Sequence, residues 1–145
     1  MKQFVLGPGM GPNYDWSMDN MTVKTSRDWA DGRVTIVEDR LKAGFHLARH
    51  CHRIMTEIFY ILEGDVDFQF DDEAVHATPG MTINIPPRVW HEVRCVSGGK
   101  LLTIFTPAGF DGYLEELSRM IEADFADGAK MTALSEKYDT WTQQG

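Results

Sequence analysis

Metal-ligand chemistry is concentrated in two short segments of the chain. The first contains two histidines and a glutamate between two glycines and reads Gly44-x5-His50-x-His52-x4-Glu57-x6-Gly64. The second adds a third histidine after a proline and reads Gly80-x5-Pro86-x4-His91. Imidazole nitrogens and carboxylate oxygens are common ligands of divalent transition metals. The two segments therefore predict a mononuclear metal site formed by His50, His52, Glu57 and His91.

The spacing of these residues suits an extended chain. Side chains at i and i+2 of a strand lie on one face, so His50 and His52 can both offer a nitrogen to one ion. Glu57 follows a turn-like gap and opens the next predicted strand, whereas His91 must come from a strand distant in sequence. Each residue taken alone fits a solvent-exposed position as well. The joint spacing is what favours a metal site.

Short β-type runs surround the two segments. Most of them are bounded by Gly, Pro, Asp or Asn, and they occupy 22–26, 34–41, 57–62, 66–70, 82–85, 92–96 and 101–106. This pattern predicts an antiparallel barrel or sandwich. The turn Glu63-Gly64-Asp65 is predicted to be a tight hairpin, and Pro79 interrupts any continuous strand at its position.

The apolar period changes after Pro107. Apolar residues recur at intervals of three and four in 111–127, which predicts a helix, and a shorter helix is predicted over 131–139. We therefore divide the chain into an irregular Gly- and Pro-rich arm (1–20), a β-barrel (21–108) and C-terminal helices (109–145). The expected fold class is all-β with a helical appendage, and the absence of an internal repeat favours a single barrel.

Charge and composition limit the expected partners. The chain has 22 acidic and 14 basic residues and a formal net charge of -8, which disfavours nucleic acid and anionic membrane surfaces. Neither a secretory signal nor an apolar run of ~20 residues is present, so a cytoplasmic location is expected. Cys51 is predicted to point away from the histidine pair, and both it and Cys95 are predicted to be reduced thiols.

The segment from Gly44 to Gly64 resembles the first motif of the cupin superfamily without a departure. The segment from Gly80 to His91 is similar to the second cupin motif, G-x5-P-x-G-x2-H-x3-N, with two departures. Arg88 stands where the family usually has glycine, and Cys95 stands where it usually has asparagine. The strand from Glu57, the Thr106-Pro107 region and the helical tail further resemble small single-domain cupins related to quercetin dioxygenase.

This resemblance implies a double-stranded β-helix, or jelly-roll barrel, that holds one divalent metal ion. Iron, manganese, nickel, cobalt, zinc and copper all suit three imidazoles and one carboxylate. Four protein ligands on an octahedral ion leave two positions for a substrate, or for a substrate and O2. In the quercetin dioxygenase-like relatives, the glutamate corresponding to Glu57 is associated with proton transfer, so Glu57 is expected to be both ligand and base. The resemblance also implies a homodimer.

Three apolar residues are candidates for the wall of a substrate pocket. Phe59 and Ile61 share the strand parity of Glu57, and Val93 shares that of His91, although each alone fits an ordinary barrel-filling role. We expect a metal-dependent enzyme acting on a small molecule with a hydroxyl or carbonyl group, with quercetinase-type dioxygenase chemistry as the first interpretation. A lyase, isomerase or polyketide-type cyclase, and a ligand-binding sensor without catalysis, remain alternatives.

Overall fold

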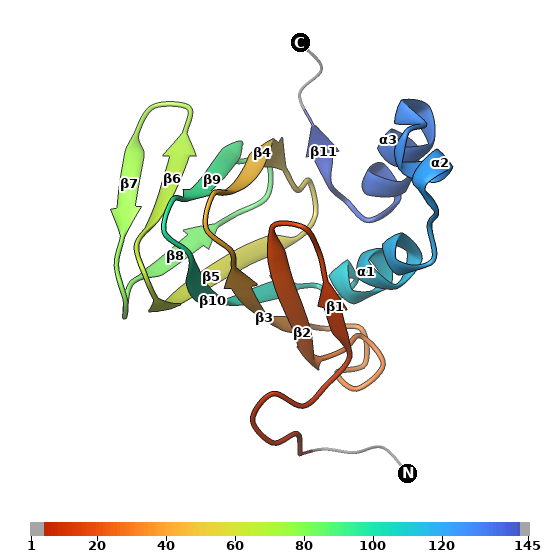
Figure 1. Cartoon of the computed structure of the whole chain (residues 1–145), viewed down its shortest axis with the longest axis horizontal. Helices are drawn as coiled ribbons and strands as arrows, with labels where there is room; N and C mark the ends of the chain where they lie inside the picture. The colour runs from red at the N-terminus through yellow and green to blue at the C-terminus, as the bar shows by residue number, and fades with distance from the viewer. Residues whose placement is uncertain (1–4, 143–145) are drawn as a thin grey trace.

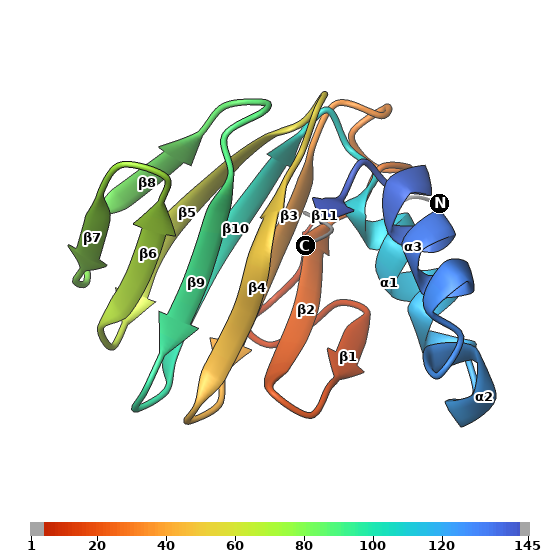
Figure 2. The ribbon, with the colours of Figure 1, turned by 90° about the horizontal axis from the view of Figure 1, so that it is seen from above.

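Two antiparallel sheets face each other in a computed structural model that describes residues 5–142 (Figures 1 and 2). The six-stranded sheet has the order β1-β2-β3-β10-β5-β8, and the five-stranded sheet has the order β11-β4-β9-β6-β7. Three short helices lie together beside the edge formed by β1 and β11, far from β7 and β8. The predicted jelly-roll architecture with a helical appendage is confirmed.

The strands of the six-stranded sheet are β1 (Asn13–Asp15), β2 (Asp19–Thr25), β3 (Thr35–Leu41), β5 (Thr56–Glu63), β8 (Thr82–Ile85) and β10 (Gly99–Thr106). Those of the other sheet are β4 (Phe45–Cys51), β6 (Val66–Phe70), β7 (Ala74–Ala77), β9 (His91–Cys95) and β11 (Trp141–Thr142). Most strands bury alternate residues, because one face of each sheet turns toward the other sheet.

The turn at Gly64 is tight, but it is not a hairpin. β5 ends at Glu63 and β6 begins at Val66, yet the two strands belong to different sheets. Gly64 has φ 79°, and a Cβ atom there would lie 2.5 Å from the carbonyl oxygen of Gly98. Glycine is required because the crossover brings two backbones into contact. The hairpin predicted from the sequence is therefore wrong, since strands adjacent in sequence need not pair.

Several strands were not predicted. The arm expected to be irregular over 1–20 contains β1 and the start of β2, which pair with each other; residues 1–4 of that arm lie outside the described part. Only the end of β4, at the histidine pair, was expected to be extended; the rest was missed because its burial does not alternate and a register shift interrupts its pairing with β9 between Leu47 and His50. β7 was missed because residues 74–77 contain a single β-branched side chain, and β11 was missed because it has only two residues.

The helical appendage is broken into shorter pieces than predicted. A continuous helix over 111–127 is replaced by α1 (Phe110–Ser118) and α2 (Glu122–Phe125), and the last helix is α3 (Gly128–Lys137). The side chain of Asp124 accepts a hydrogen bond from the backbone N–H of Ile121, 3.0 Å away, and this contact starts a new helix. Among residues 5–142, no helix has the length and apolar character needed to cross a bilayer.

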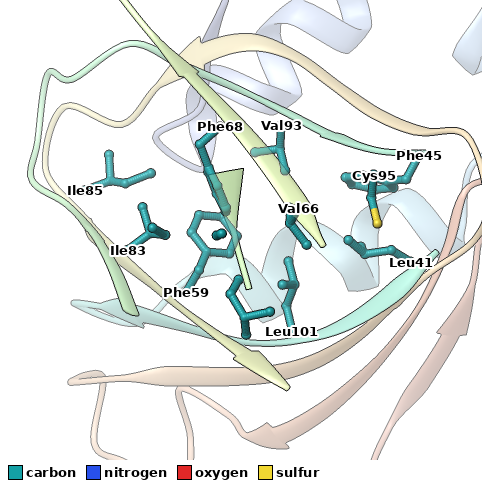
Figure 3. Packing of buried hydrophobic residues seen from close by; sticks show 12 residues of the cluster. Leu41, Phe45, Phe59, Val66, Phe68, Ile83, Ile85, Val93, Cys95 and Leu101 are labelled. Carbon is teal, nitrogen blue, oxygen red and sulfur yellow. The ribbon is translucent and has the colours of Figure 1, made fainter. Parts of the chain in front are cut away.

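The core lies between the two sheets (Figure 3). The rings of Phe59 on β5 and Phe68 on β6 pack across the gap, with centroids 5.1 Å apart. Ile61 and Val66 are fully buried in the same cluster. This apolar packing fixes the separation of the sheets and thereby the positions of the polar groups at their margin.

Candidate metal centre

Three strands deliver the predicted ligands to one point. His50 is near the end of β4, His91 opens β9 directly opposite His50, and Glu57 lies near the start of β5 in the other sheet. His52 follows β4 by one residue. All four side chains are at least 95% buried, and one ligand atom from each lies within 4.8 Å of the others. The structure thus gathers His50, His52, Glu57 and His91 as the sequence predicted.

Each histidine ring is held by a backbone carbonyl oxygen on the side away from the cluster. The Nδ1–H groups of His50 and His91 donate to the carbonyl oxygens of Ala48 and Val89, both at 2.9 Å. The Nδ1–H group of His52 donates to the carbonyl oxygen of Asp139, also at 2.9 Å. A carbonyl oxygen only accepts, so Nδ1 carries the proton in each ring. The Nε2 lone pairs are therefore available to a metal.

The contacts inside the cluster call for a positive charge between the groups. Oε1 of Glu57 lies 3.1 Å from Nε2 of His52 and 3.2 Å from Nε2 of His91. Neutral imidazoles protonated at Nδ1 have no hydrogen at Nε2 to share with a carboxylate. Ligand atoms at right angles on one ion with bonds of about 2.1 Å would be roughly 3.0 Å apart, which agrees with these distances. The donor set therefore fits one divalent metal ion.

The pKa shifts within the cluster also favour a positive charge between its groups. Burial opposes the ionised form of Glu57, but the hydrogen bonds from His52 and His91 outweigh it and lower the Glu57 pKa to about 2. Burial also lowers the pKa of His52, yet the hydrogen bond and charge of Glu57 raise it overall. Burial, followed by the nearby His91, lowers the pKa of His50 to about 4. The raised pKa of His52 shows that Glu57 favours a positive charge at this position.

The family model described as a cupin domain matches residues 37–106. This range includes all four residues of the cluster and reaches from β3 to β10. Residues 37–106 are a cupin domain.

The proteins to which this domain is similar include two with different enzyme names, a dioxygenase and a synthase. Quercetin 2,3-dioxygenase of Bacillus subtilis (strain 168) is 27% identical over 88 residues, which cover 60% of this chain but only 26% of the dioxygenase. An RmlC-like cupin from Shewanella frigidimarina matches 77% of this chain and 96% of its own, with a TM-score of 0.65 and 21% identity. An ectoine synthase from P. lautus matches 72% of this chain and 75% of its own, with a TM-score of 0.63 and 19% identity. The two structural matches show a shared fold.

The two departures from the second cupin motif have structural counterparts. Arg88 has φ 70°, a left-handed conformation that glycine adopts without strain, and its backbone N–H donates to the carbonyl oxygen of His52 at 2.6 Å. Cys95 is fully buried in the core, and its thiol contacts the carbonyl oxygen of Asp65 at 3.3 Å. Cys95 and Cys51 are both buried free thiols outside the cluster of ligands.

Asp139 supports the site from the C-terminal segment, and the sequence analysis missed it. In addition to the His52 contact, its carboxylate accepts hydrogen bonds of 2.8–2.9 Å from the backbone N–H groups of residues 53, 54 and 55. These bonds fix the turn between His52 and Glu57. The only signal in the sequence is an aspartate after a helix, which is too common to identify a role of this kind.

The cluster opens into a cavity of about 410 Å³, a typical size for a small-molecule site. Phe59 and Val93 line this cavity as predicted, and their contact with a substrate stays a prediction. Ile61 does not line it but is fully buried in the core between the sheets. The wall also contains side chains that the sequence analysis did not select, among them Asp19, Asp39, Thr103, Phe105, Phe110 and Tyr113.

Proposed function

We propose that this cupin domain binds one divalent transition-metal ion through His50, His52, Glu57 and His91 and is the catalytic part of an enzyme. The substrate would be a small organic molecule whose hydroxyl or carbonyl oxygens bind the same ion. The observation that carries this proposal is the gathering of three imidazoles and one buried carboxylate, with one ligand atom of each within 4.8 Å of the others, beside a largely apolar cavity. A purely structural zinc site has closed tetrahedral coordination and needs no adjoining cavity.

Each side chain has a defined part in this proposal. A bound divalent ion would polarise the coordinated substrate oxygens as a Lewis acid. The histidines, held at Nδ1 by carbonyl oxygens, keep their Nε2 atoms pointing to one place. Glu57 stays ionised at neutral pH, and we infer that it also accepts the proton of an incoming hydroxyl group. Phe59, Val93 and Phe105 would exclude water from the reacting atoms.

Within this class, our first proposal is dioxygenase chemistry of the quercetinase type. It is supported by the 27% identity to quercetin 2,3-dioxygenase, although that match covers only 26% of the dioxygenase. The dioxygenase reaction would consume O2, whereas a lyase, isomerase or cyclase reaction at the same ligands would not.

Oxygen uptake tests this proposal. The chain is reconstituted in turn with Fe(II), Mn(II), Ni(II) and Co(II), and O2 consumption and flavonol absorbance are followed together with quercetin. The proposal expects the O2 concentration and the flavonol absorbance to fall in parallel with wild type, and it expects neither to fall with His91→Ala. His76→Ala is the matched control, because His76 lies on an exposed part of β7. Substrate turnover without O2 uptake would contradict the dioxygenase assignment and favour a non-oxidative cupin enzyme.

A further inference from the structure

Two buried carboxyl groups lie in the cavity wall away from the ligand cluster. Asp39 on β3 and Asp19 on β2 are 5% and 6% exposed and share a hydrogen bond. In the ladder, Asp39 is opposite Met21 and Asp19 is opposite Leu41, so both side chains belong to the inner row of the sheet. Both line the same cavity as His50, His52 and Glu57.

One oxygen of this pair has no partner. Oδ1 of Asp39 is buried and accepts no hydrogen bond from any residue in the described part of the chain. Buried polar groups are almost always hydrogen-bonded, and an unpaired acceptor destabilises a folded protein. Burial of two carboxyl groups in a largely apolar wall is also less favourable in free energy than burial of apolar side chains at the same positions. A ligand that donates a hydrogen bond to Oδ1 would satisfy this atom.

The proton state of the pair indicates which donor fits. Burial, the hydrogen bond to Asp19 and the charges of Asp19 and Glu57 all raise the pKa of Asp39. Asp39 therefore stays protonated at neutral pH and donates to Asp19, which leaves Oδ1 as a carbonyl-type acceptor. A neutral hydroxyl group suits this acceptor without disturbing the shared proton.

The position of the pair sets the size of the ligand. Asp39 and Glu57 lie on strands separated by β10, and the ladder places them four residues apart along the strand direction. Their Cα atoms are therefore separated by roughly 16 Å in a flat sheet, and the inward side chains shorten the gap between their functional groups. A flat molecule of two or three rings can reach from one group to the other.

We propose that Asp39 and Asp19 form a second polar subsite, which binds a hydroxyl group at the far end of a ligand chelated at the His50–His52–Glu57–His91 cluster. The position of the chelated end rests on the proposed function. The carboxyl pair rests on its own observations, which are its burial in the cavity wall and the unpaired oxygen. Asp39 would thus select ligands by their distal hydroxyl group.

Binding of two flavonols to the metal-loaded protein tests the subsite. Quercetin and 3-hydroxyflavone share the chelating oxygens, but only quercetin has further hydroxyl groups. We expect wild type to bind quercetin about five- to tenfold more tightly. Asp39→Leu should reduce this ratio to about one by weakening the binding of quercetin. Asp39→Asn keeps the oxygen acceptor and a donor toward Asp19, so it should retain the preference.

An unchanged ratio in Asp39→Leu, or a ratio near one in wild type, would overturn the subsite. If neither flavonol binds, the proposed substrate class fails, and thermal unfolding of the ligand-free protein decides the subsite separately. A carboxyl pair kept for a ligand predicts that Asp39→Leu raises the Tm by about 2 °C or more. A lower Tm in Asp39→Leu, without flavonol binding in wild type, would show that the pair is structural and overturn the proposal.

Discussion

At the scale of single residues, the cluster is defined by which of its atoms are already engaged in hydrogen bonds. The three Nδ1 atoms are engaged by carbonyl oxygens, so only the Nε2 atoms and the Glu57 carboxylate are left for an ion. The low pKa of Glu57 has two consequences. Under the proposed function, it would keep Glu57 ionised as a ligand near neutral pH, and it would let the residue act as a base only toward a hydroxyl group acidified by the ion.

Replacement of Glu57 by glutamine should separate its two proposed roles. Glu57→Gln keeps an oxygen that can bind metal but removes the proton acceptor, so metal content should stay above about half of wild type. Turnover should fall by about 10² or more. Metal analysis and kinetics on the same preparation test this expectation. A loss of activity only in proportion to the loss of metal would show that Glu57 acts solely as a ligand.

Arg88 offers a test of local strain beside the site. Its left-handed backbone disfavours any side chain, so Arg88→Gly should raise the free energy of unfolding by about 0.5–1 kcal/mol. Arg88→Ala removes the same exposed charge but keeps the strain, and it should give no gain. Urea denaturation of the three proteins measures the difference. An equal effect of both substitutions would assign it to the side chain.

At the scale of elements, the site depends on β4 and on the C-terminal segment. The i, i+2 histidine spacing was readable from the sequence, because strand alternation is a local property. The β4 strand itself was not, since its register shift after Leu47 breaks the alternation. Asp139 could not be predicted either, because its contacts bring residues 53–55 to a segment more than 80 residues away.

Removal of the Asp139 carboxylate should weaken the metal site without removing a ligand. Asp139→Ala frees three backbone N–H groups in the turn between His52 and Glu57, and metal affinity should fall about tenfold or more. Asp127→Ala is the matched control, because Asp127 caps α3 through Lys130 and does not contact the cluster. Competition with a chelator measures both affinities. Equal losses in the two variants would contradict a specific role for Asp139.

At the scale of the whole molecule, the acidic chain buries three carboxyl groups around one cavity. Glu57 is stabilised as an anion by imidazoles, whereas Asp39 is kept neutral by burial and by Asp19.

The barrel and the ligand cluster were predictable because motif spacing and strand pattern are sequence properties. The acidic pair was not, because it depends on the pairing of β2 with β3. The homodimer stays a prediction, which a molar mass from light scattering can test.

Asp39 should make the stability of the metal-free protein fall as pH rises. Its pKa is raised on folding, so the folded state retains a proton that the unfolded chain releases above about pH 4. Asp19 and Glu57 reinforce this effect, while Lys42 acts on Asp19 in the opposite direction. Asp39→Asn should therefore gain stability relative to wild type between about pH 5 and 8. A constant difference in urea unfolding would contradict the raised pKa.

Metal stoichiometry tests the central claim most directly. The purified chain is reconstituted with each divalent metal, freed of excess ion and analysed by mass spectrometry. We predict about one equivalent per chain in wild type and in His46→Ala/His76→Ala, which changes two exposed histidines. His50→Ala/His91→Ala should hold less than about a tenth of an equivalent. Less than a tenth of an equivalent in wild type, or equal loading of the two double variants, would contradict a metal centre at His50, His52, Glu57 and His91.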